Sequence, residues 1–178
     1  MTNTVRVLGI DPGSRVTGYG VVEIDGALTR PLAWGGIRTT GEHSERLKQI
    51  FSAVGALVAE HAPDEIAIER VFVHRNADSA LKLGQARAAA LCATFSVDIP
   101  IHEYAPREVK KAIAGNGGAE KSQVEYMVKV LLGLRGEMQA DAADALAIAL
   151  CHINTRHNLA RMAGASSFRR GRLVRTQT

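Results

Sequence analysis

Four carboxylates interrupt apolar stretches of this chain at three distant places. Asp11 follows the run from Val5 to Ile10, and Glu69 follows Ile66-Ala67-Ile68. Asp141 and Asp144 lie three residues apart in a stretch rich in alanine and leucine. An ionised carboxylate is costly to remove from water unless it has a partner, so each position requires an explanation.

The spacing of these acids predicts one shared metal site. On a helix, Asp141 and Asp144 would project from neighbouring points of one face. The residues beside them are too small to block the approach of a sheet: Ala140, Ala142, Ala143 and Ala145. Two carboxylates about 4 Å apart repel by roughly 4 kcal/mol at an effective dielectric near 20. Such a cluster must therefore bind protons or cations.

The ligand atoms indicate which cation would bind. Oxygen ligands without His or Cys favour Mg²⁺, with Mn²⁺ as the alternative ion. Two such ions per site could hydrolyse a phosphodiester with water as nucleophile.

Each acid also has a simpler interpretation. Asp11 opens Asp-Pro-Gly, a good turn sequence. Glu69 could pair with Arg70 at an exposed strand end, and Asp141 and Asp144 could face solvent on an amphipathic helix. A single site explains all four positions at once, whereas the simpler interpretations require three coincidences.

The elements that must position these acids follow from periodicity and turn signals. Strands are predicted at residues 5–10, 19–24, 31–39, 65–71 and 99–104, and helices at 44–61, 76–95, 107–114, 120–134 and 139–157. This order predicts an α/β fold. Its mixed five-stranded sheet would be an antiparallel meander continued by parallel strands, with helices on both faces. Sites in such sheets form at strand ends near the switch in strand order, where Asp11 and Glu69 are expected.

Composition limits the class of protein. A chain of 178 residues fits one domain with a substantial core. No apolar run is long enough to cross a bilayer and the N-terminus has no signal-peptide pattern, so we expect a cytoplasmic protein without a membrane partner. Cys92 and Cys151 have no CxxC or Cys/His spacing, which argues against zinc and against a disulfide framework.

The net charge of +4 is unevenly distributed. The chain after Ile153 contains six arginines and no acid. We expect a nuclease domain at residues 1–158 and a basic, disordered tail at residues 159–178. A basic tail beside one concentrated acidic spot suits a polyanion that meets a metal site, although a solubilising tail would have the same composition.

Several blocks of the sequence resemble the RuvC family of Holliday junction resolvases. The similarity spans roughly residues 5 to 153, in order. Its blocks are Gly9-Ile10-Asp11-Pro12-Gly13-Ser14 with Thr17-Gly18-Tyr19-Gly20, Ala67-Ile68-Glu69 before Val71-Phe72, residues 76–87, residues 119–124, and Asp141-Ala142-Ala143-Asp144-Ala145-Leu146-Ala147.

The resemblance implies an RNase H-like fold, a homodimer and Mg²⁺-dependent nicking. The nicks would be paired, on two like-polarity strands of four-way junction DNA, during recombination and repair. It also implies a branch-migration complex, RuvA and RuvB, as a partner. Asp11, Glu69, Asp141 and Asp144 match the four catalytic acids of the family, which bind its metal ions.

Other residues are candidates for contacts with DNA. Lys121 follows a glycine-rich loop in the first turn of a helix, where it could reach a phosphate, and it resembles a family lysine near the scissile phosphate. Lys110 resembles a second basic contact, although either lysine could be a solvated surface residue. Phe72 could stack on a base opened at the junction or anchor its own loop. The further candidates for phosphate contacts are Arg15, Arg70, Arg75 and Lys82.

Three other functions compete with junction resolution. An actin-like ATPase or sugar kinase also has an Asp-x-Gly loop after a strand, but it requires a duplicated domain that this chain lacks. Another RNase H-like nuclease would cut a different nucleic acid, such as RNA in hybrids. A junction-binding protein without catalysis would not need the complete set of acids.

Overall fold

The computed structural model describes residues 4–71, 76–162, 167–169 and 172–174. Five strands form the main sheet in the order β3-β2-β1-β4-β5. Their bounds are Val5–Asp11 for β1, Val16–Asp25 for β2, Leu28–Arg38 for β3, Glu65–Glu69 for β4 and Ile101–Tyr104 for β5. β1, β2 and β3 pair antiparallel, whereas β1 pairs with β4 and β4 with β5 in parallel. The predicted mixed sheet is therefore confirmed.

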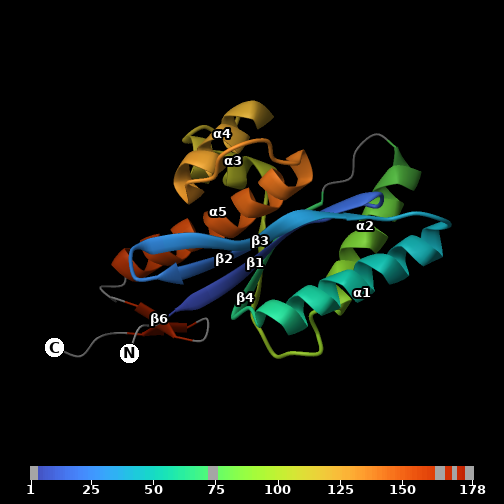
Figure 1. Ribbon diagram of the computed structural model, residues 1–178, viewed down its shortest axis with the longest axis horizontal. Coiled ribbons are helices and arrows are strands. Elements are labelled where there is room, and N and C mark those ends of the chain that lie inside the picture. Colours follow the sequence, from blue (N-terminus) through green and yellow to red (C-terminus); the bar gives the residue numbers. More distant parts are fainter. Residues whose placement is uncertain (1–3, 72–75, 163–166, 170–171, 175–178) are drawn as a thin grey trace.

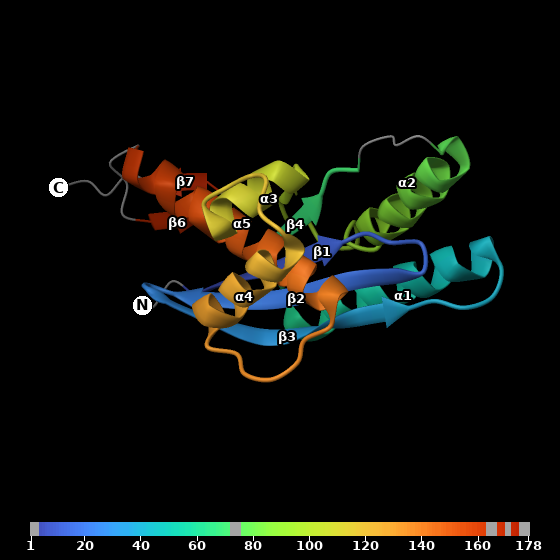
Figure 2. The ribbon, with the colours of Figure 1, turned by 90° about the horizontal axis from the view of Figure 1, so that it is seen from above.

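Helices cover both faces of this sheet (Figure 1). One face packs against α1 (His43–His61) and α2 (Ala77–Cys92), and the other against α3 (Pro106–Ala114), α4 (Lys121–Leu132) and α5 (Ala140–Met162). Because side chains alternate along a strand, β1 contributes Val7 to the α5 side and Leu8 and Ile10 to the α1 side. Figure 2 shows α5 crossing the strands obliquely, with α3 and α4 beside it.

Glycines allow α5 to lie unusually close to β1 and β2. A Cβ at Gly9 would lie 2.2 Å from the carbonyl oxygen of Ala145, and a Cβ at Gly18 would lie 2.0 Å from that of Asp141. A Cβ at Gly20 would lie 2.7 Å from the side chain of Leu146. Glycine within a strand often marks such a close approach of another backbone. The three glycines thus set the position of α5, and with it the position of Asp141 and Asp144.

Most element bounds agree with the sequence prediction, and the differences are local. β4 ends at Glu69 rather than at Val71, so Glu69 is the last residue of its strand. α5 continues to Met162, beyond the predicted end at His157. Within the segment where the sequence predicted disorder, β6 (Ser167–Arg169) and β7 (Arg172–Val174) form a short antiparallel pair. The domain boundary after residue 158 stays a prediction.

Among the described residues, none of the helices has the combination of length and apolar composition needed to cross a membrane.

Candidate active site

Strand geometry places Asp11 and Glu69 side by side. β1 and β4 run parallel, with Ile10 opposite Ile68. The next residues, Asp11 and Glu69, are therefore neighbours, and each is the last residue of its strand. Gly9 contacts α5 and Ala67 packs in the core on the α5 side. Because side chains alternate with period two, Asp11 and Glu69 face α5 as well.

The N-terminal part of α5 brings the other two acids to the same edge. Gly18, on which the backbone of Asp141 rests, pairs with Asp11 across β1 and β2. Asp144 lies one turn further along the helix and is half-buried, with 29% of its side chain exposed. The i, i+3 spacing places both aspartates on one face of α5, and the charges of both act on Asp11.

Three of the four acids line one cavity of about 170 Å³. Asp11 comes from β1, Glu69 from β4 and Asp144 from α5. Lys110 and Lys121 add positive charge to the wall, and the rest of the lining is apolar: Pro106, Val109 and Val124. Asp141 is not part of this lining, although its charge acts on Asp11. Of the four acids that the sequence predicted in one cluster, three therefore line the cavity, and the fourth, Asp141, acts on Asp11 through its charge.

Burial and mutual repulsion keep Asp11 protonated at neutral pH. Removal from water, together with the smaller effects of the charges of Glu69, Asp144 and Asp141, raises the pKa of Asp11 to about 8, against the opposing effect of Lys121. The pKa of Glu69 is also raised, first by burial and then by Asp144. Carboxylates in this situation gain from any cation that approaches them.

Lys121 is the first residue of α4 and reaches across to α5. Its Nζ lies 2.8 Å from Oδ2 of Asp144. This hydrogen bond and the charge of Asp144 raise the pKa of Lys121, so the side chain stays an ammonium. Glu120 forms a reciprocal capping box with Gln123, which fixes the start of the helix and the base of the lysine.

The donor set of the cavity fits a hard divalent cation. All its anionic donors are carboxylate oxygens, which Mg²⁺ prefers over nitrogen or sulfur ligands. The pKa values of Asp11 and Glu69 are raised first by burial and then by neighbouring carboxylates, so a bound cation would stabilise their ionised forms. Asp11, Glu69 and Asp144 are therefore the residues that would hold such an ion, with Asp141 close to Asp11.

The other predicted DNA contacts are scattered. Lys110 lines the cavity, whereas Arg15 is exposed in the loop between β1 and β2. Arg70 pairs with Glu108 at 3.3 Å, and Lys82 pairs with Asp78 at 2.7 Å. Phe72 and Arg75 lie outside the described residues.

Arg87 on α2 is a residue that the sequence did not single out. Its Nε donates to the carbonyl oxygen of Glu69 at 3.2 Å, and its Nη2 donates to Oε1 of Glu103 at 2.6 Å. Arg87 therefore ties the last residue of β4 to α2 and β5. The only sequence signal was its place in the motif ending Gly84-Gln85-Ala86-Arg87, which gives no indication of this contact.

A mixed sheet in this order, with acids at the ends of β1 and β4 and on the helix that crosses them, belongs to the RNase H-like class. The model of the family described as "Crossover junction endodeoxyribonuclease RuvC" matches residues 7–152. A crossover junction endodeoxyribonuclease RuvC from Hahella chejuensis is 54% identical over 170 residues, which are 95% of this chain and 99% of that protein. The chain belongs to the RuvC family of nucleases.

Solved structures agree with this assignment. Thermus thermophilus RuvC in complex with a Holliday junction substrate is similar with a TM-score of 0.80 and 38% identity, over 90% of this chain and 98% of that chain. The yeast mitochondrial Holliday junction resolvase shares the fold at a TM-score of 0.63 and 15% identity, over 89% of this chain and 86% of that chain.

Proposed function

We propose that this protein is a Mg²⁺-dependent endonuclease that resolves four-way DNA junctions by paired nicks on two like-polarity strands, during recombination and repair. The observation that carries the proposal is the cavity in which Asp11, Glu69 and Asp144 meet Lys121. Membership of the RuvC family and the Holliday junction bound by the Thermus thermophilus relative support the choice of substrate.

The acidic, basic and apolar residues of the cavity have different roles in the proposed reaction. Asp11, Glu69 and Asp144, assisted by Asp141, hold Mg²⁺, in the expected number of two ions per site. When bound, the ions supply an activated water and stabilise the leaving oxygen. Lys121 and Lys110 attract the scissile phosphate to the acidic cavity, which would otherwise repel it. Pro106, Val109 and Val124 form an apolar wall that limits water around the reacting groups.

We further propose that the protein acts as a homodimer. Two equivalent strands of a junction require two equivalent active sites related by a twofold axis. α1 and α2 pack together, and large apolar side chains on them and just after α2 are exposed: Phe51, Leu81, Phe95 and Val97. These residues are available to a second copy. Sedimentation equilibrium of the wild type and of Phe51→Ser with Leu81→Ser tests whether they hold a dimer.

The remaining contacts follow from charge and from the family. Arg15, Arg70 and Lys82 are proposed to bind phosphates outside the cavity, together with Arg75. Phe72 is proposed to stack on an opened base, and the arginine-rich tail at residues 159–178 to add nonspecific attraction to DNA. Association with RuvA and RuvB is a further proposal from the family, which co-purification with the two proteins tests.

The decisive experiment is a nicking assay with and without Mg²⁺ on a four-way junction, a linear duplex and an RNA–DNA hybrid. We expect paired nicks in the junction alone, and none with EDTA. Asp11→Asn should abolish nicking yet leave junction binding largely intact, because binding depends on phosphate contacts and shape. Preferential cutting of the hybrid would assign another RNase H-like activity, and junction binding without nicking by the wild type would contradict the enzymatic proposal.

A further inference from the structure

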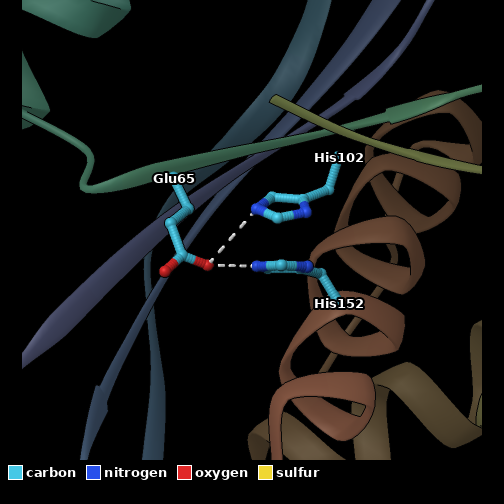
Figure 3. A group of neighbouring side chains, drawn as sticks. All are labelled: Glu65, His102 and His152. Carbon is cyan, nitrogen blue, oxygen red and sulfur yellow. Dashed lines mark hydrogen bonds and ion pairs between the residues drawn. The ribbon is translucent and has the colours of Figure 1, made fainter. Parts of the chain in front are cut away.

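A second polar cluster lies on the same face of the sheet as the acidic cavity. Glu65 begins β4, four residues before Glu69, and His152 lies eight residues after Asp144 on α5. Four residues of strand span about 13 Å, so the cluster is separate from the cavity. Figure 3 shows Glu65 with the imidazoles of His102 on β5 and His152 on α5 directed at its carboxylate.

The three side chains offer metal-binding atoms at close range. One nitrogen of each histidine and one carboxylate oxygen of Glu65 all lie within 4.8 Å of one another. The imidazole rings are stacked with their centroids 4.3 Å apart. Glu65 and His152 are almost completely buried, whereas the side chain of His102 is 36% exposed. His102 is therefore the ligand on the solvent side, from which a small ion would approach the cluster.

His102 shows that the protein groups alone do not satisfy this cluster. His152 Nε2 hydrogen-bonds to Oε2 of Glu65, and Arg156 donates to Oε1. By contrast, Nε2 of His102 is buried, lies 4.0 Å from Oε2 of Glu65 and has no hydrogen-bond partner. Buried polar atoms of folded proteins rarely lack a partner. This nitrogen is aimed at the point where a shared ligand of all three residues would lie.

The second nitrogen of His152 also has a hydrogen-bond partner, as metal-bound histidines generally do. Its Nδ1 lies 2.7 Å from the hydroxyl oxygen of Tyr104. Burial raises the pKa of Tyr104 to about 12, so the phenol stays protonated and neutral. In a metal-bound form Nδ1–H would donate to the Tyr104 oxygen, leaving the lone pair of Nε2 for the ion. Such partners orient ligating histidines and support metal affinity.

We propose that Glu65, His102 and His152 form a second metal site, which takes Zn²⁺ through two imidazole nitrogens and one carboxylate oxygen. Imidazole ligands suit Zn²⁺ rather than Mg²⁺, and two His with one Glu is a known zinc ligand set. The positive charge of Arg156 beside the carboxylate repels the ion, so the affinity for Zn²⁺ is lower than it would be without a neighbouring cation. The bound ion cross-links β4, β5 and α5 beneath the active site and stabilises their packing.

This site was not expected from the sequence, which argued against zinc on cysteine spacing. The ligands are separated by 37 and 50 residues, from Glu65 to His102 and from His102 to His152. They come together only because β5 pairs with β4 and α5 lies across both. No local sequence motif indicates such a site.

The test is a Zn²⁺ titration of untagged, EDTA-treated and dialysed full-length protein in excess Mg²⁺, followed by calorimetry and by the melting temperature. We expect one Zn²⁺ per chain and a rise in the wild-type melting temperature. His102→Ala should lose both, and Tyr104→Phe should weaken binding about 10–100-fold. Circular dichroism verifies that His102→Ala is folded, as its partial exposure leads us to expect.

Asp11→Asn serves as the matched control, because it alters the acidic cavity and leaves the cluster intact. It should keep the full zinc response. Replacing Zn²⁺ by Co²⁺ adds a spectroscopic readout, since nitrogen ligation in a four-coordinate site gives visible absorption that His102→Ala should lose. Zinc binding that survives His102→Ala but is lost in Asp11→Asn would assign the ion to the acidic cavity and overturn the proposal. So would the lack of any stoichiometric binding by the wild type.

Discussion

The ammonium of Lys121 lies 2.8 Å from the carboxylate of Asp144 and joins the start of α4 to the first turns of α5. The lysine offsets part of the negative charge that Glu69 and Asp144 bring to the cavity. A divalent ion bound by Asp144 would compete with this ammonium for the same oxygen. Lys121 would then be free to contact a phosphate, so we infer that metal binding and phosphate binding are coupled through this pair.

Lys121→Met should reduce nicking far more than it reduces junction binding. The substitution keeps an apolar stem of similar length but removes the charge that we propose attracts the phosphate. Loss of one charged contact at a reacting centre costs on the order of 10²-fold or more in rate, whereas one phosphate contact among many changes affinity little. Single-turnover nicking and gel-shift titration measure the two quantities. Lys111→Met is the control, because Lys111 lines a different cavity, and equal rate loss in both variants would contradict the role of Lys121.

The metal-free protein should lose stability as the pH rises toward 8, because of Asp11. The pKa of this group is 3.8 in the unfolded chain and about 8 in the folded one. Below the unfolded pKa both states are protonated and the stability is fully present. Between the two values the unfolded state releases a proton that the folded state retains, so stability falls with pH by up to about 1.4 kcal/mol per pH unit. Urea unfolding in EDTA from about pH 5 to pH 8 measures this slope.

Asp11→Asn isolates the contribution of that carboxyl. The amide cannot ionise, so the variant should become more stable than the wild type in EDTA, by a margin that grows with pH. Mg²⁺ should stabilise the wild type more than the variant, because it binds the ionised carboxylate. A difference between the two proteins that does not change from about pH 5 to pH 8 would show that Asp11 is already ionised in the fold.

The sheet could be predicted because its signals are local. Apolar runs bounded by turn signals predicted the five strands, and in the structure Gly26, at a φ of +61°, lies in the short turn between β2 and β3. The carboxyl ends of β1 and β4 then placed Asp11 and Glu69 together, since a parallel pair ends at one edge. The pairing of Asp141 with Asp144 was visible from helical spacing alone. These parts of the site needed no long-range information.

The remaining parts depend on contacts between distant segments. Gly9 and Gly18 read as turn or strand glycines in the sequence, and only the packing shows that α5 rests on them. Arg87 acts through the backbone carbonyl of Glu69, so no feature of its own segment reveals the contact. The cluster of Glu65, His102 and His152 combines three elements. Sequence patterns report the period of an element, but not which side chains of different elements meet.

Gly18→Ala should displace α5 and destabilise the protein. The new methyl would lie 2.0 Å from the carbonyl oxygen of Asp141, a backbone atom that cannot move without the helix. Overpacking of this kind costs typically about 1–3 kcal/mol, and the shifted Asp141 and Asp144 should lower the nicking rate. Gly84→Ala in α2 is the control, since its methyl meets nothing within 4 Å and should stabilise the helix by about 0.5–1 kcal/mol. Urea unfolding compares the two, and similar effects would disprove the close-packing argument.

Arg87→Lys should slow nicking without weakening junction binding. A lysine keeps the charge near Glu103 but lacks the Nε–H that donates to the Glu69 carbonyl, so the end of β4 loses one of its supports. Contacts that orient metal ligands are worth about 10–100-fold in metal affinity or activity. We therefore expect the Mg²⁺ concentration for half-maximal nicking to rise by a factor in that range.

Arg46→Lys is the matched control. Arg46 lies on α1, and its Nε also donates to a backbone carbonyl, that of Gly41. If both variants need the wild-type concentration of Mg²⁺, Arg87 does not position Glu69. If Arg87→Lys changes the junction affinity and leaves the Mg²⁺ dependence unaltered, Arg87 instead contacts DNA.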